Sequence, residues 1–112
     1  MKPYAPYIPL NISEIMDLLG WMMLNAPKFE DDTGYFAGQN IETEFLALNG
    51  GLSNIRKKVG EEAYQALITI SDKMREHFEA DPDDVGAGGR EGRTCIREME
   101  DILIASARRK SR

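Results

Sequence analysis

The stretch "IETEFLALNGGLSNIRKKV", residues 41–59, decides the fold class of this chain. Its large apolar residues recur at alternating spacings of four and three, which places them on one face of an α-helix. The register continues across Gly50 and Gly51, although two glycines cost about 2 kcal/mol relative to alanine inside a helix. The pattern predicts one helix over 41–58, with Asn40 as its cap and the glycines admitting a close neighbour; two short helices are the alternative. The apolar residues are Ile41, Phe45, Leu48, Leu52, Ile55 and Val59.

A helix over residues 12–25 is indicated by several local signals that agree. Asn11 is a suitable N-cap, Glu14 three residues later can close a capping box, and Pro27 stops the helix. Its apolar residues extend beyond one face and include Trp21. This helix is therefore expected to be central in the bundle or to be covered by a partner.

Two more helices are expected in the second half of the chain. One begins at Glu61 and ends before Pro82, and the other runs from about Arg90 to Ala107. The linker between them, "DPDDVGAGG", has the composition of a turn. The sequence therefore predicts an all-α fold, a single-domain bundle of about four helices over residues 1–112.

The first ten residues form a proline-rich arm. Prolines recur at every third position, and Tyr4, Tyr7 and Leu10 share this period, which matches the three-residue turn of polyproline II. One edge of the arm is therefore apolar. We expect the arm to pack along the bundle, with contact to a partner as the alternative.

Composition and charge bound the classes of function. The chain has 112 residues, a net charge of −5 and one cysteine, which excludes an intramolecular disulfide. The first ten residues lack the features of a signal peptide, and no apolar run approaches the 18 residues of a membrane span. We therefore expect a cytoplasmic protein. Residues 1–50 hold seven acids against two lysines, so the net negative charge belongs to the first half and should attract basic partners.

The loop "KFEDDTGYFAG", residues 28–38, places three consecutive acids among aromatic residues. Carboxylates beside rings are suited to occupy a nuclease cleft, because the acids pair with basic residues meant for phosphate and the rings fill places meant for bases. The alternative is that Phe29 and Phe36 seal the end of the bundle while the acids face water. Tyr35 and Trp21 are candidate anchors of an interface. The predicted partner-binding residues are Glu30, Asp31, Asp32, Tyr35, Phe36, Glu42 and Glu44.

Enzymatic and nucleic-acid functions find weak support in the sequence. His77 and Cys95 lack a third orienting residue, and "DPDDVG" opens like a calcium loop but lacks the glutamate that should end it. Arg90 and its neighbouring arginines are interleaved with acids, which disfavours binding to phosphate. No catalytic residue, metal or cofactor is therefore predicted. A metal-dependent nucleotide pyrophosphohydrolase stays an alternative, because Glu98 and Asp101 have half of its acidic signature.

Residues 45–103, from "FLALNGGLSNIRKKVGEEAYQALI" through "FEADPDD" to "GRTCIREMEDIL", resemble small acidic immunity proteins of bacterial contact-dependent inhibition and related polymorphic toxin systems. The resemblance implies a cytoplasmic, non-enzymatic protein that binds and neutralises one cognate toxin domain, often a nuclease. A homo-oligomeric structural or regulatory protein is the alternative, with the apolar surface of the 12–25 helix forming a homodimer.

Overall fold

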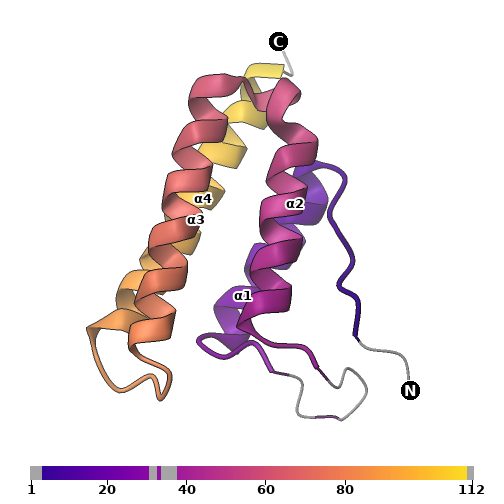
Figure 1. Ribbon diagram of the computed structural model, residues 1–112. Coiled ribbons are helices and arrows are strands. Elements are labelled where there is room, and N and C mark those ends of the chain that lie inside the picture. Colours follow the sequence, from indigo (N-terminus) through magenta and orange to yellow (C-terminus); the bar gives the residue numbers. More distant parts are fainter. Residues whose placement is uncertain (1–3, 31–32, 34–37, 111–112) are drawn as a thin grey trace.

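A computed structural model describes residues 4–30, 33 and 38–110, and it contains four helices. These are α1 (Ile12–Asn25), α2 (Ile41–Val59), α3 (Glu61–Ala80) and α4 (Ala87–Lys110). The helices alternate in direction, and each packs on the next one in the chain, while α1 also packs on α4 and closes the bundle (Figure 1). The predicted all-α bundle of four helices is confirmed.

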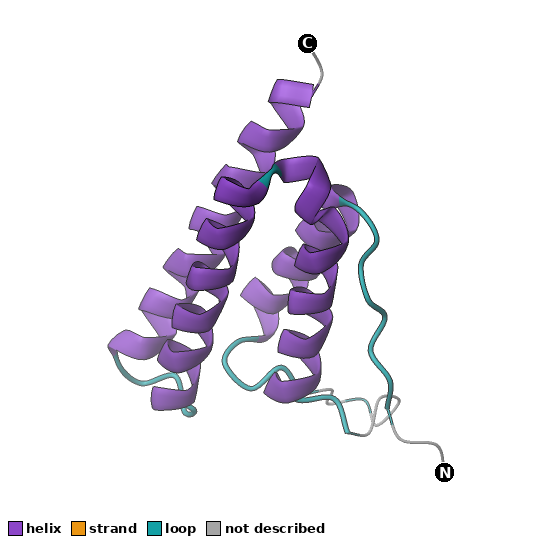
Figure 2. Cartoon of the chain, turned by 45° about the horizontal axis from the view of Figure 1, so that its top comes forward, coloured by secondary structure: helices purple, strands orange, loops and turns teal. Residues whose placement is uncertain are grey.

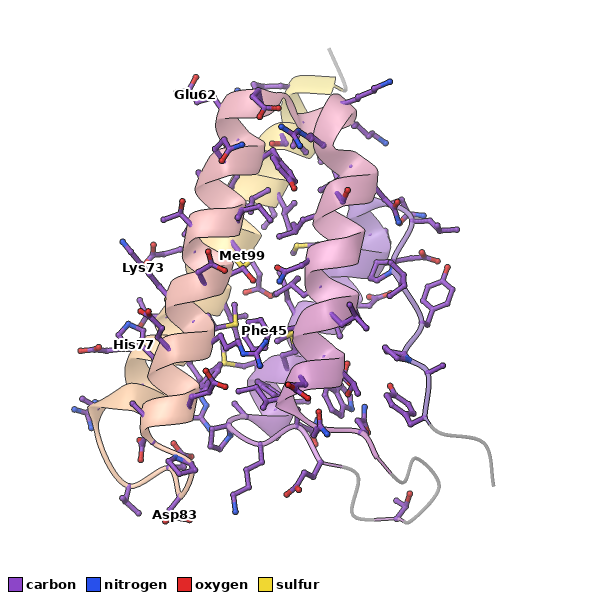
Figure 3. All side chains as sticks on the ribbon, viewed as in Figure 1. Phe45, Glu62, Lys73, His77, Asp83 and Met99 are labelled. Atoms are coloured by element: carbon purple, nitrogen blue, oxygen red, sulfur yellow. The ribbon has the colours of Figure 1, made fainter. Side chains whose placement is uncertain are left out.

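Helices and loops make up the whole described part of the chain, as Figure 2 shows. The loop that follows α1 and the loop that follows α3, where Figure 3 labels Asp83, lie at the same end of the bundle. Arg93 of α4 links these two loops, because its guanidinium donates to the carbonyl of Ala26 at 3.2 Å and to Asp84 at 2.9 Å. Within the described ranges, no helix combines the length and the apolar character needed to cross a membrane.

Helix α2 is continuous through its two glycines, as predicted, and the close neighbour is the N-terminal arm. A Cβ on Gly50 would lie 2.8 Å from Cγ2 of Ile8, and one on Gly51 would lie 3.0 Å from Cβ of Pro9. The amide of Asn54 donates to the carbonyl of Pro9 at 2.8 Å. Residues 4–10 therefore pack along the bundle, as predicted, and the glycines of α2 make room for them.

The helix ends follow the local signals in the sequence. The side chain of Asn11 accepts from the backbone N–H of Glu14 at 2.9 Å. Asn40 and Thr43 form a reciprocal capping box at the start of α2. Gly60 has a φ of 92° and separates α2 from α3. Each of these caps satisfies backbone groups that a helix terminus would otherwise leave unpaired.

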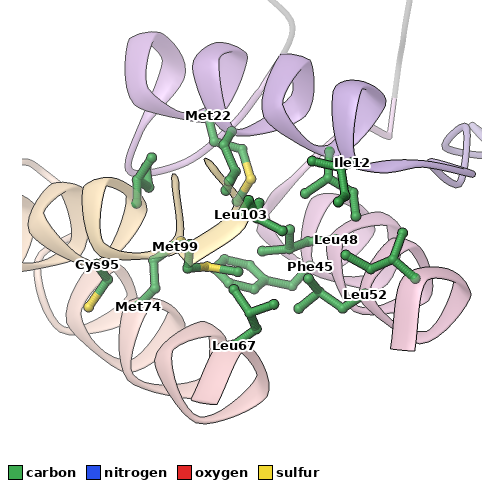
Figure 4. Packing of buried hydrophobic residues seen from close by; sticks show 14 of the residues in the cluster. Ile12, Met22, Phe45, Leu48, Leu52, Leu67, Met74, Cys95, Met99 and Leu103 are labelled. Atoms are coloured by element: carbon green, nitrogen blue, oxygen red, sulfur yellow. The ribbon is translucent and has the colours of Figure 1, made fainter. Parts of the chain in front are cut away.

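One hydrophobic core joins the four helices, and Figure 4 shows its methionines, leucines and Phe45 interdigitating. Phe29 contributes to this core although it lies outside the helices. Its ring is fully buried and makes edge-to-face contacts with Phe45 and Phe78, at centroid separations of 6.1 and 5.4 Å. Phe29 therefore seals the loop end of the bundle, as the alternative interpretation of the acidic loop expected for this residue.

Helix α4 begins earlier than predicted. The sequence placed its start near Arg90, but the helix begins at Ala87 and includes Gly88, Gly89 and Gly92. A Cβ on Gly88 would lie 2.4 Å from the carbonyl oxygen of His77, and one on Gly92 would lie 2.4 Å from Cε1 of Phe78. Glycine is required here because α4 approaches α3 closely, and this packing outweighs the low helix propensity of glycine.

Candidate functional site

The structure separates those predicted partner-binding acids that it describes, Glu30, Glu42 and Glu44. Asp31, Asp32, Tyr35 and Phe36 lie outside the described residues. Glu30 is exposed and borders a hollow formed by the two loops at one end of the bundle, next to Pro82 and Asp83. Glu42 is also exposed, and its carboxylate lies 4.0 Å from the guanidinium of Arg75 on α3.

The prediction that Glu44 lies on an exposed surface is wrong. It is only 3% exposed and faces the arm. Glu42 and Glu44 are two positions apart on a helix, so their side chains point in different directions. Glu30, Glu42 and Glu44 border different hollows and do not form one surface.

A groove between the arm, α1 and the start of α2 collects acidic and aromatic side chains. We call it the arm groove; it has a volume of about 390 Å³. From α1, its walls include Glu14, Asp17 and Trp21, which recur at helical spacing on one face. No lysine, arginine or histidine of the described residues lines it. Its lining consists of Tyr4, Tyr7, Pro9, Glu14, Asp17, Leu18, Trp21, Gln39 and Glu44.

The buried end of the arm groove is held by Tyr4 and Glu44. The tyrosine hydroxyl donates to Oε1 of Glu44 at 3.2 Å, and the side-chain amide of Gln39 donates to the same oxygen. Burial of the ring, the negative charge of Glu44 and this hydrogen bond raise the pKa of Tyr4 to about 12. Tyr4 therefore remains a donor at neutral pH and ties the arm to α2.

The outer end of the arm groove is held by Tyr7 and Glu14. The hydroxyl of Tyr7 lies 2.9 and 3.0 Å from the two carboxylate oxygens of Glu14, and the backbone N–H of Leu10 donates to Oε1 at 2.8 Å. The hydrogen bond to Glu14 raises the pKa of Tyr7. The predicted capping box of α1 is therefore wrong in one detail: Glu14 reaches back to Leu10, not to the cap residue Asn11.

Asp17 is the carboxylate of the arm groove that is left for a ligand. It is exposed and, within the described chain, has no hydrogen bond or ion pair, whereas Glu14 and Glu44 are both held by tyrosines. Trp21 lies one turn further along α1 and is half-buried. A free carboxylate beside aromatic rings can bind a cationic group through charge and through the negative faces of the rings.

The sequence contained the components of this groove without their arrangement. The period of Tyr4 and Tyr7 and the helical spacing of Asp17 and Trp21 were both visible, and Trp21 was an expected anchor. Glu14 was assigned only to a helix cap. The arm brings these residues together by packing over Gly50 and Gly51. This path of the arm could not be predicted from the sequence.

The other polar clusters of the described chain stabilise the fold. Asp81 accepts from the backbone N–H groups of Val85, Gly86 and Gly89 at 2.9–3.0 Å, and these hydrogen bonds lower its pKa. A carboxylate committed to three amides caps α4 and is unsuited to begin a calcium loop.

Neither of the candidate enzymatic residues lies in a reactive setting. Cys95 is buried, which raises the pKa of its thiol, and His77 lies 3.1 Å from a carboxylate oxygen of Glu91. Glu98 and Asp101 are exposed. The described residues contain no group of three histidine, cysteine or acidic side chains arranged to hold a metal, so the hydrolase alternative gains no support from them.

The comparisons with known proteins found no relative of this chain: no family model matches it, and no curated protein or solved structure is detectably similar. The function must therefore be argued from the arm groove and the charge of the molecule.

Proposed function

We propose that this protein is a cytoplasmic immunity protein, without enzymatic activity, that neutralises a cognate toxin domain by binding its basic surface. The observation that carries the proposal is the arm groove, in which Glu14, Asp17 and Glu44 lie among aromatic rings and no basic residue of the described chain lines the groove. Nucleases bear lysine and arginine residues that bind phosphate, so a nuclease domain presents the complementary charge. The resemblance of residues 45–103 to immunity proteins points to the same class.

The surface around the arm groove has the apolar contacts that a stable complex needs. Tyr7 and Leu10 of the arm are 64% and 66% exposed, and they flank the carboxylates of α1. Aromatic residues that are already held in place lose little conformational entropy on binding and often dominate the affinity of an interface. In this proposal, contacts of Tyr7 and Trp21 slow the dissociation of the complex, and the charges of the acids speed its association.

The acidic loop has a supporting place in the proposal. Its last residue adjoins the arm groove, since a Cβ on Gly38 would contact Tyr4 at 3.4 Å and the next residue, Gln39, lines the groove. The described end of the loop therefore reaches α2 beside the groove. The acids of the loop would add to the net negative charge that attracts a basic partner.

Protection of cells from the toxin tests the proposal. The toxin domain is taken from the C-terminal region of the gene that directly precedes this one, and it is expressed with and without this protein. We expect growth to be restored and a stable complex to be recovered from the cells. Undiminished toxicity together with the absence of a complex would refute the proposed function.

Self-association is the second candidate, and one feature of the structure favours it. A groove of about 720 Å³ between α1 and α4 has an apolar floor that includes Ile12, Met16 and Ile104, the last of them 40% exposed. A second copy could cover this floor. Sedimentation of the purified protein decides the matter, because a monomer at micromolar concentration would exclude this candidate.

A further inference from the structure

We infer that the arm groove receives the side chain of one arginine of the partner; this inference rests on the proposed function and specifies its central contact. Two independent features point to a cationic occupant. The groove holds three carboxylates and no base of the described residues, and its walls include the rings of Tyr4, Tyr7 and Trp21. Carboxylates attract any cation, but aromatic walls favour one that can also lie against a ring.

The same molecule shows how an arginine meets this combination of groups. The guanidinium of Arg56 lies 4.4 Å from the centre of the Tyr64 ring. Its Nε donates to Oε1 of Glu61 at 2.8 Å, and its Nη2 donates to the other carboxylate oxygen. One planar guanidinium thus lies against a ring and donates two hydrogen bonds to a carboxylate at the same time. A lysine ammonium group is not planar and cannot donate two parallel hydrogen bonds to one carboxylate in this way.

The arm groove also offers a carboxylate and a ring, those of Asp17 and of Trp21, whose ring packs on Phe29 at a centroid separation of 6.2 Å. Within the described chain, Asp17 has no hydrogen bond or ion pair, and Trp21 lies four residues further along α1, about 6 Å along the helix axis. Tyr7, from the arm, lines the same groove. A guanidinium that binds Asp17 can therefore lie against one of these rings while the aliphatic part of the arginine side chain contacts Leu18 and Pro9.

Nuclear magnetic resonance with a small probe tests this inference without the toxin. The labelled protein is titrated at low salt with N-acetyl-arginine amide, and the indole N–H signal of Trp21 is followed. We expect a saturable shift of this signal and a weaker response to N-acetyl-lysine amide. A shift that is equal for both probes, or no shift of the indole, would overturn the inference.

Variants locate the binding within the groove. Asp17→Asn and, separately, Tyr7→Leu should each weaken arginine binding about two- to fivefold, because each removes one contact to the cation. Asp72→Asn is the matched control, since Asp72 is likewise an exposed acid and lies on α3, outside the groove. If Asp17→Asn behaves like Asp72→Asn, the arm groove is not the arginine site.

The two proposals fail in different ways. If the probe binds at Trp21 but the protein does not neutralise the toxin, the groove is an arginine site and the immunity function is wrong. If the protein neutralises the toxin and the probe does not bind, the function stands and the contact must lie elsewhere on the surface.

Discussion

At the scale of single residues, Tyr4 and Glu44 show how a predicted surface acid became part of the interior. The carboxylate of Glu44 accepts hydrogen bonds from Tyr4 and Gln39, so its burial is compensated. Because folding raises the pKa of Tyr4 from 10.0 to about 12, first through burial of Tyr4 and then through Glu44, the protonated tyrosine favours the folded state most fully below pH 10. This contribution is lost as the pH rises through 12, when the tyrosine loses its proton beside a negative charge.

The tyrosinate absorbance tests this assignment. On titration with base, one tyrosine should ionise near pH 12, well above the usual value of 10.0. Tyr4→Phe should remove this late step and should make stability less dependent on pH between 10 and 12. A late step that persists in Tyr4→Phe would show that another tyrosine is responsible.

Gly92 and Gly20 form a matched pair for the packing of α4 against α3. A Cβ on Gly92 would lie 2.4 Å from the ring of Phe78, which is buried in the core, whereas a Cβ on Gly20 of α1 would meet no atom within 4 Å. Gly92→Ala should therefore lower the free energy of unfolding by about 1–3 kcal/mol. Gly20→Ala should raise it by up to about 1 kcal/mol, because alanine has the higher helix propensity.

Urea denaturation of both variants measures this difference. Equal effects of Gly92→Ala and Gly20→Ala would show that α4 does not approach α3 as closely as described.

At the scale of elements, the sequence predicted most helix ends because their signals are local. Asn11, Asn40 and Gly60 act within a few residues, and the structure uses each of them. The start of α4 was wrong by three residues for a different reason. Gly88 and Gly92 give α3 room to approach, and the cap of α4 is Asp81, which lies in the preceding loop. A contact with another helix leaves no local signal.

Removal of the Asp81 cap should destabilise the protein. Asp81→Asn weakens three hydrogen bonds to backbone N–H groups and should lower Tm by about 5 °C. Asp83→Asn is the control, because the neighbouring Asp83 is exposed and makes none of these hydrogen bonds. Thermal unfolding followed by circular dichroism measures both variants. Similar values of Tm for the two would contradict the role of Asp81.

The pH dependence of the same variants gives a second test. Folding lowers the pKa of Asp81, so its contribution to stability is present above the ordinary value of 3.8 and is lost as the pH falls below it. Asp81→Asn should therefore lose less stability on acidification than the unaltered protein loses.

At the scale of the whole molecule, charge is distributed unevenly along the bundle. The last turn of α2 carries Arg56, Lys57 and Lys58, and it lies at the end opposite the loops with Glu30, Asp83 and Asp84. Such a distribution orients a charged partner before contact, and its effect decreases as salt is added. In the proposed function, this separation of charge would guide a basic toxin away from the basic end of the bundle and toward its acidic part.

The sequence predicted the character of the candidate site better than its place. It indicated acids beside rings in the first half, and the arm groove is built from that half. The sequence assigned these roles to the loop at 28–38, however, and it placed Glu44 on the surface. The position of the arm depends on packing against Gly50 and Gly51, and side chains brought together by such packing share no spacing in the sequence.

The most direct test of the central claim is the affinity for the toxin domain of two charge-reversal variants, measured by calorimetry. Asp17→Lys places a cation in the arm groove and should weaken binding at least about tenfold, because it repels the partner and blocks the arginine site. Asp72→Lys makes the same change of charge outside the groove and should alter the affinity by less than about threefold. Equal loss of affinity in both variants, or no loss in either, would contradict the claim that the arm groove binds the toxin.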